Sequence, residues 1–156
     1  MNILFFLKPK SEVACVMEDF TLRQTLEKMD YHKYTAVPLL NHKGEYIGTL
    51  TEGDLLRFIK KRYSLNLQEA EDINIMKVPR RWYNKPINVN CNMEDLFLTA
   101  MQQNFVPVTD DDGTFIGIIC RKDIMEYYYQ HICPSDKSKD NRAVVLQEPV
   151  KAVTCQ

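Results

Sequence analysis

The chain has 156 residues, 45% of them hydrophobic, which suits one compact unit or two small halves that share an interface. Its 20 Lys and Arg residues nearly balance 21 Asp and Glu residues, so no global field favours nucleic acid or an acidic membrane surface as a partner. Five scattered cysteines without a Cys-x-x-Cys pair favour a reducing cytoplasm, and no segment approaches the ~20 apolar residues of a membrane span.

The first half of the chain predicts a strand, a helix, two strands and a second helix. The apolar run VACV predicts the short first strand, and TLRQTLEKM spaces its apolar residues as an amphipathic helix behind the N-cap Thr21. YTAVPLL and YIGTL then predict two strands around the turn NHKGE. A second helix, DLLRFIKKRY, begins at Asp54.

Residues 64–85 are expected to link this half to a second one. The linker contains VPRRWYNKP, whose prolines favour extended chain. The strand INVN, the helix NMEDLFLTAM, the strands FVPVTD and TFIGIIC and the helix DIMEYYYQHI follow in the same order as before. The polar tail, residues 133–156, is expected to be partly mobile, with AVVL as an edge strand or a partner contact.

The two halves also match residue by residue. VPL…GTLTEGD, which contains Gly48, returns at one constant offset as VPV…GIICRKD, which contains Gly117. A β-α-β-β-α unit of this size cannot cover both faces of its own small sheet. We therefore predict an α+β fold in which two tandem repeats, residues 1–63 and 86–132, pack sheet to sheet about a pseudo-twofold axis.

Thr51 and Asp54 of the first motif have two interpretations. They have the spacing of a capping box at the start of a helix. A carboxylate can also accept hydrogen bonds from both hydroxyls of a ribose, and a loop that leads into a helix suits a phosphate group. In the second copy Cys120 is a poor cap while the acid Asp123 remains. Ligand binding is therefore favoured for the pair of motifs, and capping can coexist with it.

The doubled signature resembles a tandem pair of cystathionine-β-synthase (CBS) domains, a Bateman module, over roughly residues 1–132. The resemblance implies regulation by an adenosine-containing ligand such as AMP, ADP, ATP, S-adenosylmethionine or cyclic di-AMP. Since no enzyme, channel or DNA-binding domain accompanies the pair, it implies a stand-alone sensor, usually a homodimer, that signals in trans to a target protein. The cyclic di-AMP receptor proteins of Gram-positive bacteria are similar at SEVA, at YTA before Val37, and at the basic pair Arg121 and Lys122.

Carried over by position, the resemblance implies two nucleotide pockets, each built from both repeats. We expect the phosphate-rich ligand in the second, because the first motif carries Glu52 and no base of its own unless Arg80 or Arg81 approaches from the linker. The first pocket would contain Thr51, Asp54, Val89, Asn104 and Phe105, and the second Ala14, Thr35, Ala36, Cys120, Arg121, Lys122 and Asp123.

We expect no catalytic activity, because the chain has no Ser-His-Asp order, HExxH, GxGxxG or Walker loop. Its three histidines have no metal-ligand spacing, so we expect no metal site either. The alternative function is a protein-interaction module whose pockets are vestigial, which Cys120 and the acidic first loop favour. The lone Trp82 either packs under the linker or covers a ligand or partner.

Overall fold

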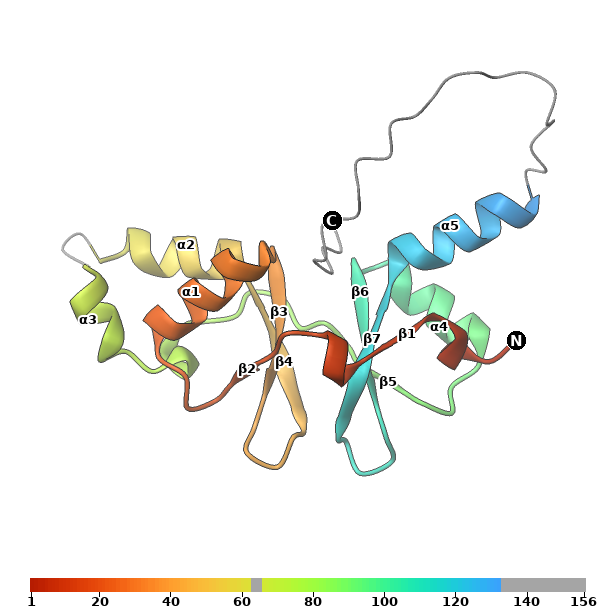
Figure 1. Cartoon of the computed structure of the whole chain (residues 1–156), viewed down its shortest axis with the longest axis horizontal. Coiled ribbons are helices and arrows are strands. Elements are labelled where there is room, and N and C mark those ends of the chain that lie inside the picture. The colour runs from red at the N-terminus through yellow and green to blue at the C-terminus, as the bar shows by residue number, and fades with distance from the viewer. Residues whose placement is uncertain (63–65, 133–156) are drawn as a thin grey trace, which may run out of the picture.

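The computed structural model describes residues 1–62 and 66–132, which form two small sheets that lie next to each other with helices on their outer sides (Figure 1). Our expectations for residues 133–156 concern residues outside this part. The elements in chain order are η1 (Ile3–Phe6), β1 (Leu7–Pro9), η2 (Lys10–Glu12), β2 (Val16–Met17), α1 (Leu22–His32), β3 (Ala36–Leu40), β4 (Tyr46–Thr51), α2 (Glu52–Lys60), α3 (Leu67–Glu71), η3 (Ile75–Lys77), β5 (Ile87–Asn88), α4 (Met93–Ala100), β6 (Phe105–Thr109), β7 (Phe115–Cys120) and α5 (Arg121–Ile132).

Each repeat builds the same arrangement of a short parallel strand beside an antiparallel hairpin. In the first repeat β2 pairs with β3 in parallel and β3 with β4 antiparallel. In the second repeat β5, β6 and β7 are related in the same way. The helices begin where the caps predict, since Thr21 completes a capping box at α1 and the side chain of Asn92 accepts a hydrogen bond at α4. The predicted α+β class with two β-α-β-β-α repeats is confirmed.

The N-terminal segment belongs to the second sheet rather than the first. Strand β1 pairs antiparallel with β7, so the sheet order is β1-β7-β6-β5, and Figure 1 shows this segment starting near α4 and crossing to β2. Ile3 and Phe6 are buried in the second core. At Gly117 an added Cβ would lie 2.1 Å from the Lys8 carbonyl oxygen. The pairing covers an edge of β7 that would otherwise be open.

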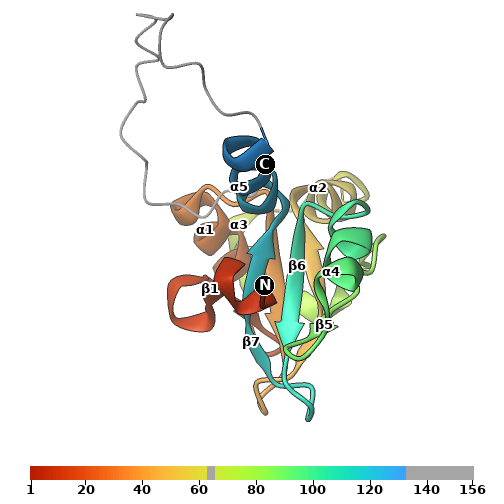
Figure 2. The same cartoon turned by 90° about the vertical axis from the view of Figure 1, so that its right-hand side faces the viewer.

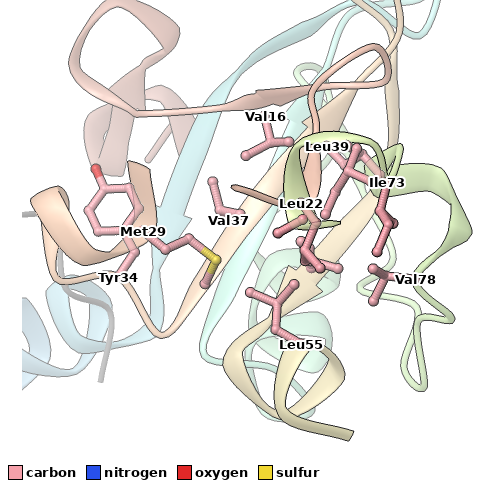
Figure 3. Close-up of a cluster of buried hydrophobic side chains, with 12 residues drawn as sticks. Val16, Leu22, Met29, Tyr34, Val37, Leu39, Leu55, Ile73 and Val78 are labelled. Atoms are coloured by element: carbon pink, nitrogen blue, oxygen red, sulfur yellow. The ribbon is translucent and has the colours of Figure 1, made fainter. Parts of the chain in front are cut away.

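The linker, as far as Val78, completes the first core. Four of its residues, Ala70, Ile73, Ile75 and Val78, are buried in the cluster that Val16, Leu22 and Val37 help to form. Figure 3 shows Ile73 and Val78 beside Leu22 and Leu39. The backbone N–H of Leu22 donates to the carbonyl of Ile73 over 2.7 Å. Because α3 and η3 contribute apolar side chains, this stretch folds onto α1 instead of running extended.

The two sheets meet through a mixed cluster and through their hairpin tips. Val13, Leu40 and Tyr46 of the first half pack with Phe105, Phe115, Ile118 and Cys120 of the second. The tips exchange equivalent hydrogen bonds, from Tyr46 N–H to the Gly113 carbonyl at 3.3 Å and from Phe115 N–H to the Gly44 carbonyl at 2.9 Å, and they lie together in both views (Figures 1 and 2). This reciprocity is what a pseudo-twofold axis between repeats produces.

Among the described residues, no helix has the length and apolar character needed to cross a membrane.

Candidate functional site

The two motifs form equivalent corners, at which a strand ends and a helix begins. Thr51 ends β4 before α2, and Cys120 ends β7 before α5. Each corner is tied to the start of its own hairpin, because Glu52 N–H donates to the Thr35 carbonyl and Arg121 N–H to the Asn104 carbonyl, both over 2.9 Å. Both corners lie at the end of the molecule opposite the hairpin tips (Figure 1).

In the first corner Asp54 is a buried capping residue. It is only 2% exposed. Thr51 N–H donates to Asp54 Oδ2 over 3.0 Å, and Asp54 N–H donates to Thr51 Oγ1 over 3.1 Å, which completes a capping box. The other oxygen, Oδ1, accepts from Arg57 Nη2 over 2.7 Å and from the backbone N–H of Arg81 over 3.1 Å. Both oxygens of the carboxylate are therefore occupied within the chain.

These contacts set the ionisation of Asp54. Burial by itself would raise the pKa of this carboxyl group, but the hydrogen bonds from Arg81, Thr51 and Arg57 outweigh it and hold the pKa below its usual value. Asp54 is therefore a carboxylate near neutral pH. The capping role is present in the structure, whereas the ribose contact stays a prediction, since a ribose hydroxyl would have to replace the Arg81 N–H or the Arg57 guanidinium.

Two arginines of the linker, Arg80 and Arg81, lie at this corner. Arg80 lies against Gly48, where an added Cβ would be 2.9 Å from its Nη1. A pocket of about 240 Å³ opens beside Asp54, lined by α2 and the linker residues 79–81. The predicted partners of Asp54 do not line it, because Val89 packs against the second core and Phe105 is buried between the sheets. Asn104 is exposed and bound to Arg121 instead.

In the second corner the carboxylate is paired with a residue that the sequence did not indicate. Lys8 Nζ lies 2.8 Å from Asp123 Oδ2 and donates to Cys120 Sγ over 3.6 Å. Lys8 comes from β1, and no motif or spacing links it to Asp123. Only the pairing of β1 with β7 brings it there.

The two basic residues of the second corner, Arg121 and Lys122, have different surroundings. Arg121 Nη2 donates to Asn104 Oδ1 over 2.5 Å, so its side chain turns toward its own repeat. Lys122 is exposed. Next to them a shallow hollow of about 370 Å³ is lined by Asp123 and by residues 5–8, 126–127 and 130. The second corner therefore presents one exposed base beside a carboxylate that already has a counter-ion.

The remaining predicted residues have different surroundings, and Ala14 packs against the first core. Ala36 packs in the mixed cluster that contains Cys120. Ala14 N–H donates to the hydroxyl of Tyr34 over 3.4 Å, and Thr35 is exposed at the start of β3. The structure thus brings Ala36 and Cys120 together, with Asp123 one turn farther along, and the cross-repeat pocket itself stays a prediction.

A family model described as "CBS domain" matches residues 7–61 and 84–130. Among solved structures, CbpB in complex with c-di-AMP has a TM-score of 0.74 at 22% identity, covering 85% of this chain and 87% of that one. CbpB of Listeria monocytogenes in complex with c-di-AMP has a TM-score of 0.69 at 21% identity, covering 81% and 93%. CBSX2 in complex with AMP has 0.65 at 19%, covering 84% and 98%. At these identities the likeness shows the fold.

One curated relative, an "uncharacterized protein" of Methanopyrus kandleri, is 29% identical over 99 residues, which are 64% of this chain. The chain spans about half the length of this relative, since the matched region is 49% of it.

Proposed function

The chain belongs to the family of CBS-domain proteins, and on that premise we propose that it is a regulatory sensor of an adenine nucleotide that signals in trans to a partner protein, without catalytic activity. The observation that carries the proposal is the pair of equivalent strand-to-helix corners, each with a carboxylate at its first helical turn. A ribose needs such an acceptor, and phosphate needs the bases beside it.

The structural neighbours support adenosine as the shared part of the ligand. CbpB is solved with c-di-AMP and CBSX2 with AMP. We place cyclic di-AMP slightly ahead of AMP, ADP or ATP for this chain, because two of the neighbours above are solved with c-di-AMP and the receptor-like basic pair Arg121 and Lys122 opens the helix that carries Asp123. In this proposal Ala14, Thr35 and Ala36 form the adenine side of the second pocket.

The second candidate function is an interaction module. A shallow apolar hollow between α4 and α5 is lined by Phe97, Ala100, Met101, Ile124 and Met125, among others. Met101 and Met125 are 69% and 64% exposed, and such a surface fits a second copy or a target protein. The proposed homodimer and the target in trans would use a face of this kind.

A thermal-shift panel of AMP, ADP, ATP, S-adenosylmethionine and cyclic di-AMP tests the sensor. At a ligand concentration near 100 times Kd the linkage gain is about 2.7 kcal/mol, which for a chain of this size is roughly 5–10 °C. A shift with one adenosine compound, and none with guanosine or uridine counterparts, supports the sensor. No shift with any of the five would refute it and leave the interaction module.

A further inference from the structure

Helices α4 and α5 present an apolar face to solvent. A hollow of about 300 Å³ between the two helices is lined by apolar side chains and by Arg121. On α4, the exposed Leu98 lies one turn before Met101. On α5, Met125 is followed at helical spacing by Tyr129 and Ile132, which are exposed as well. We call this surface the α4–α5 face, and it consists of Phe97, Leu98, Met101, Met125, Tyr129 and Ile132.

The fold does not require an apolar face here, because the first repeat carries charges at several of the same positions. The N-caps Thr21 and Asn92 align α1 with α4, and the starts of α2 and α5 align these two helices. Leu56 is the counterpart of Met125 and is apolar as well. The counterparts of Leu98, Met101 and Tyr129, however, are the exposed residues Glu27, Asp30 and Lys60. An apolar surface that only one of two equivalent units carries is explained by something that binds to it.

The sequence that follows α5 contains a segment of matching character. Ten residues, CPSDKSKDNR at 133–142, lead from Ile132 to AVVL at 143–146, the longest unbroken apolar run after α5. Ten residues span at most about 33–36 Å, whereas Met125 lies only about 10 Å from Ile132 along the axis of α5. The apolar run can therefore reach the hollow of its own chain.

Charge and concentration both favour this occupant. Arg121 donates to the amide oxygen of Asn104 and forms no ion pair with a carboxylate of residues 1–62 or 66–132. A segment that runs back along α5 from Ile132 brings Glu148 toward Arg121, and the opposite charges attract. A short linker gives a tethered ligand an effective concentration on the order of millimolar, which a second copy reaches only in a very concentrated solution.

We propose that the α4–α5 face binds residues 143–146 of its own chain, with Val144, Val145 and Leu146 in the hollow. These side chains carry no charge that would have to be desolvated. The exposed methionines of the hollow adapt to their shape, because a thioether side chain is flexible. The bound segment keeps the face from a second copy or a target protein until it leaves. The inference does not rest on the proposed sensor, because it involves neither Asp54 nor Asp123.

Methyl NMR of the whole chain, labelled at methionine, follows Met101 and Met125 directly. We expect V144D/V145D to shift both signals, because a carboxylate is costly to bury in an apolar hollow. The matched control V150D/V153D adds the same charge farther along the chain and should leave them in place. The signal of Met29, which is buried in the first core, should stay unchanged in both variants and shows that the fold is kept. In the natural sequence the signals should not depend on protein concentration, because the contact lies within one chain.

The variant M101S/M125S tests the same contact from the other side. Amide hydrogen exchange of residues 143–146 should become at least about tenfold faster than in the natural sequence, because the segment loses its binding surface. Unmoved Met101 and Met125 signals in V144D/V145D, or equal shifts in V150D/V153D, would overturn the proposal. Signals that move with protein concentration and not with V144D/V145D would show instead that a second copy covers the face. Signals that respond to neither would leave the face to a target protein, which also overturns the proposal.

Discussion

Lys8 and Asp123 form an ion pair, Nζ to Oδ2 at 2.8 Å, that joins the N-terminal strand to the first turn of the last helix. Asp123 is the carboxylate that we propose for a ribose. Lys8 is its counter-ion in the structure, so a nucleotide must compete with Lys8 for Asp123, after which the ammonium group is free to face a phosphate.

Replacing Lys8 with Met should therefore separate the two parts of a nucleotide. We expect K8M to bind adenosine up to about fivefold more tightly, because a partly exposed ion pair is worth roughly 0.2–1 kcal/mol. AMP should gain less, since its phosphate loses a cation. Calorimetry of both ligands measures this, with K10M as the control at an exposed neighbour. Unchanged adenosine affinity in K8M would show that Lys8 and the ribose do not compete.

Asp54 and Asp123 should differ in how much they contribute to the stability of the fold. Asp54→Ala should destabilise the fold by about 2–4 kcal/mol, because it removes a cap and strips the acceptor from Arg57 and from the Arg81 N–H. Asp123→Ala should cost less than about 1 kcal/mol, because its ion pair is partly exposed. Urea denaturation gives both values.

For binding, the order is reversed. Asp123→Ala should weaken the phosphate-rich nucleotide more than Asp54→Ala does, measured by calorimetry under conditions where both variants are folded. Equal losses would contradict the assignment of that ligand to the second pocket.

Asp54 should also make the protein sensitive to acid. Its pKa is lowered in the folded state, whereas an unfolded Asp titrates near about 3.9. The stabilisation is therefore fully present above the unfolded pKa and is lost as the pH falls through the lower folded pKa. The free energy of unfolding, measured in urea below about pH 5, should fall less steeply in Asp54→Asn than in the natural sequence. Identical slopes would mean that Asp54 is not the group responsible.

The contact of β1 with β7 can be tested at Gly117. Gly117→Ala places a Cβ 2.1 Å from the Lys8 carbonyl, and we expect a loss of about 1–3 kcal/mol as the strands separate. Amide hydrogen exchange of β1 should accelerate. The matched control is Gly53→Ala, whose Cβ would lie 3.2 Å from the flexible end of Arg57 and 3.7 Å from Thr51 Oγ1 and sits in α2, where Ala is favoured. Unaltered exchange in β1 would argue against the pairing.

Much of the fold could be predicted because its signals are local. The period of the apolar residues, the cap residues Thr21 and Asn92 and the repeated Val-Pro strands predicted the elements and their order, which the structure confirms. The pairing of the N-terminal strand β1 with the sheet of the second repeat was not predicted. LKP at residues 7–9 has no alternation that indicates a strand, and its pairing depends on the open edge of β7.

The candidate site shows the same division. The sequence by itself determined that two corners exist and that each carries a carboxylate, because the motif lies within a few consecutive residues and recurs in both halves. Only the tertiary structure decided what these carboxylates contact. Asp54 binds Arg81 of the linker and Asp123 binds Lys8 of the first strand, because an electrostatic interaction depends on distance in space, and that distance is set when segments remote along the chain pack together.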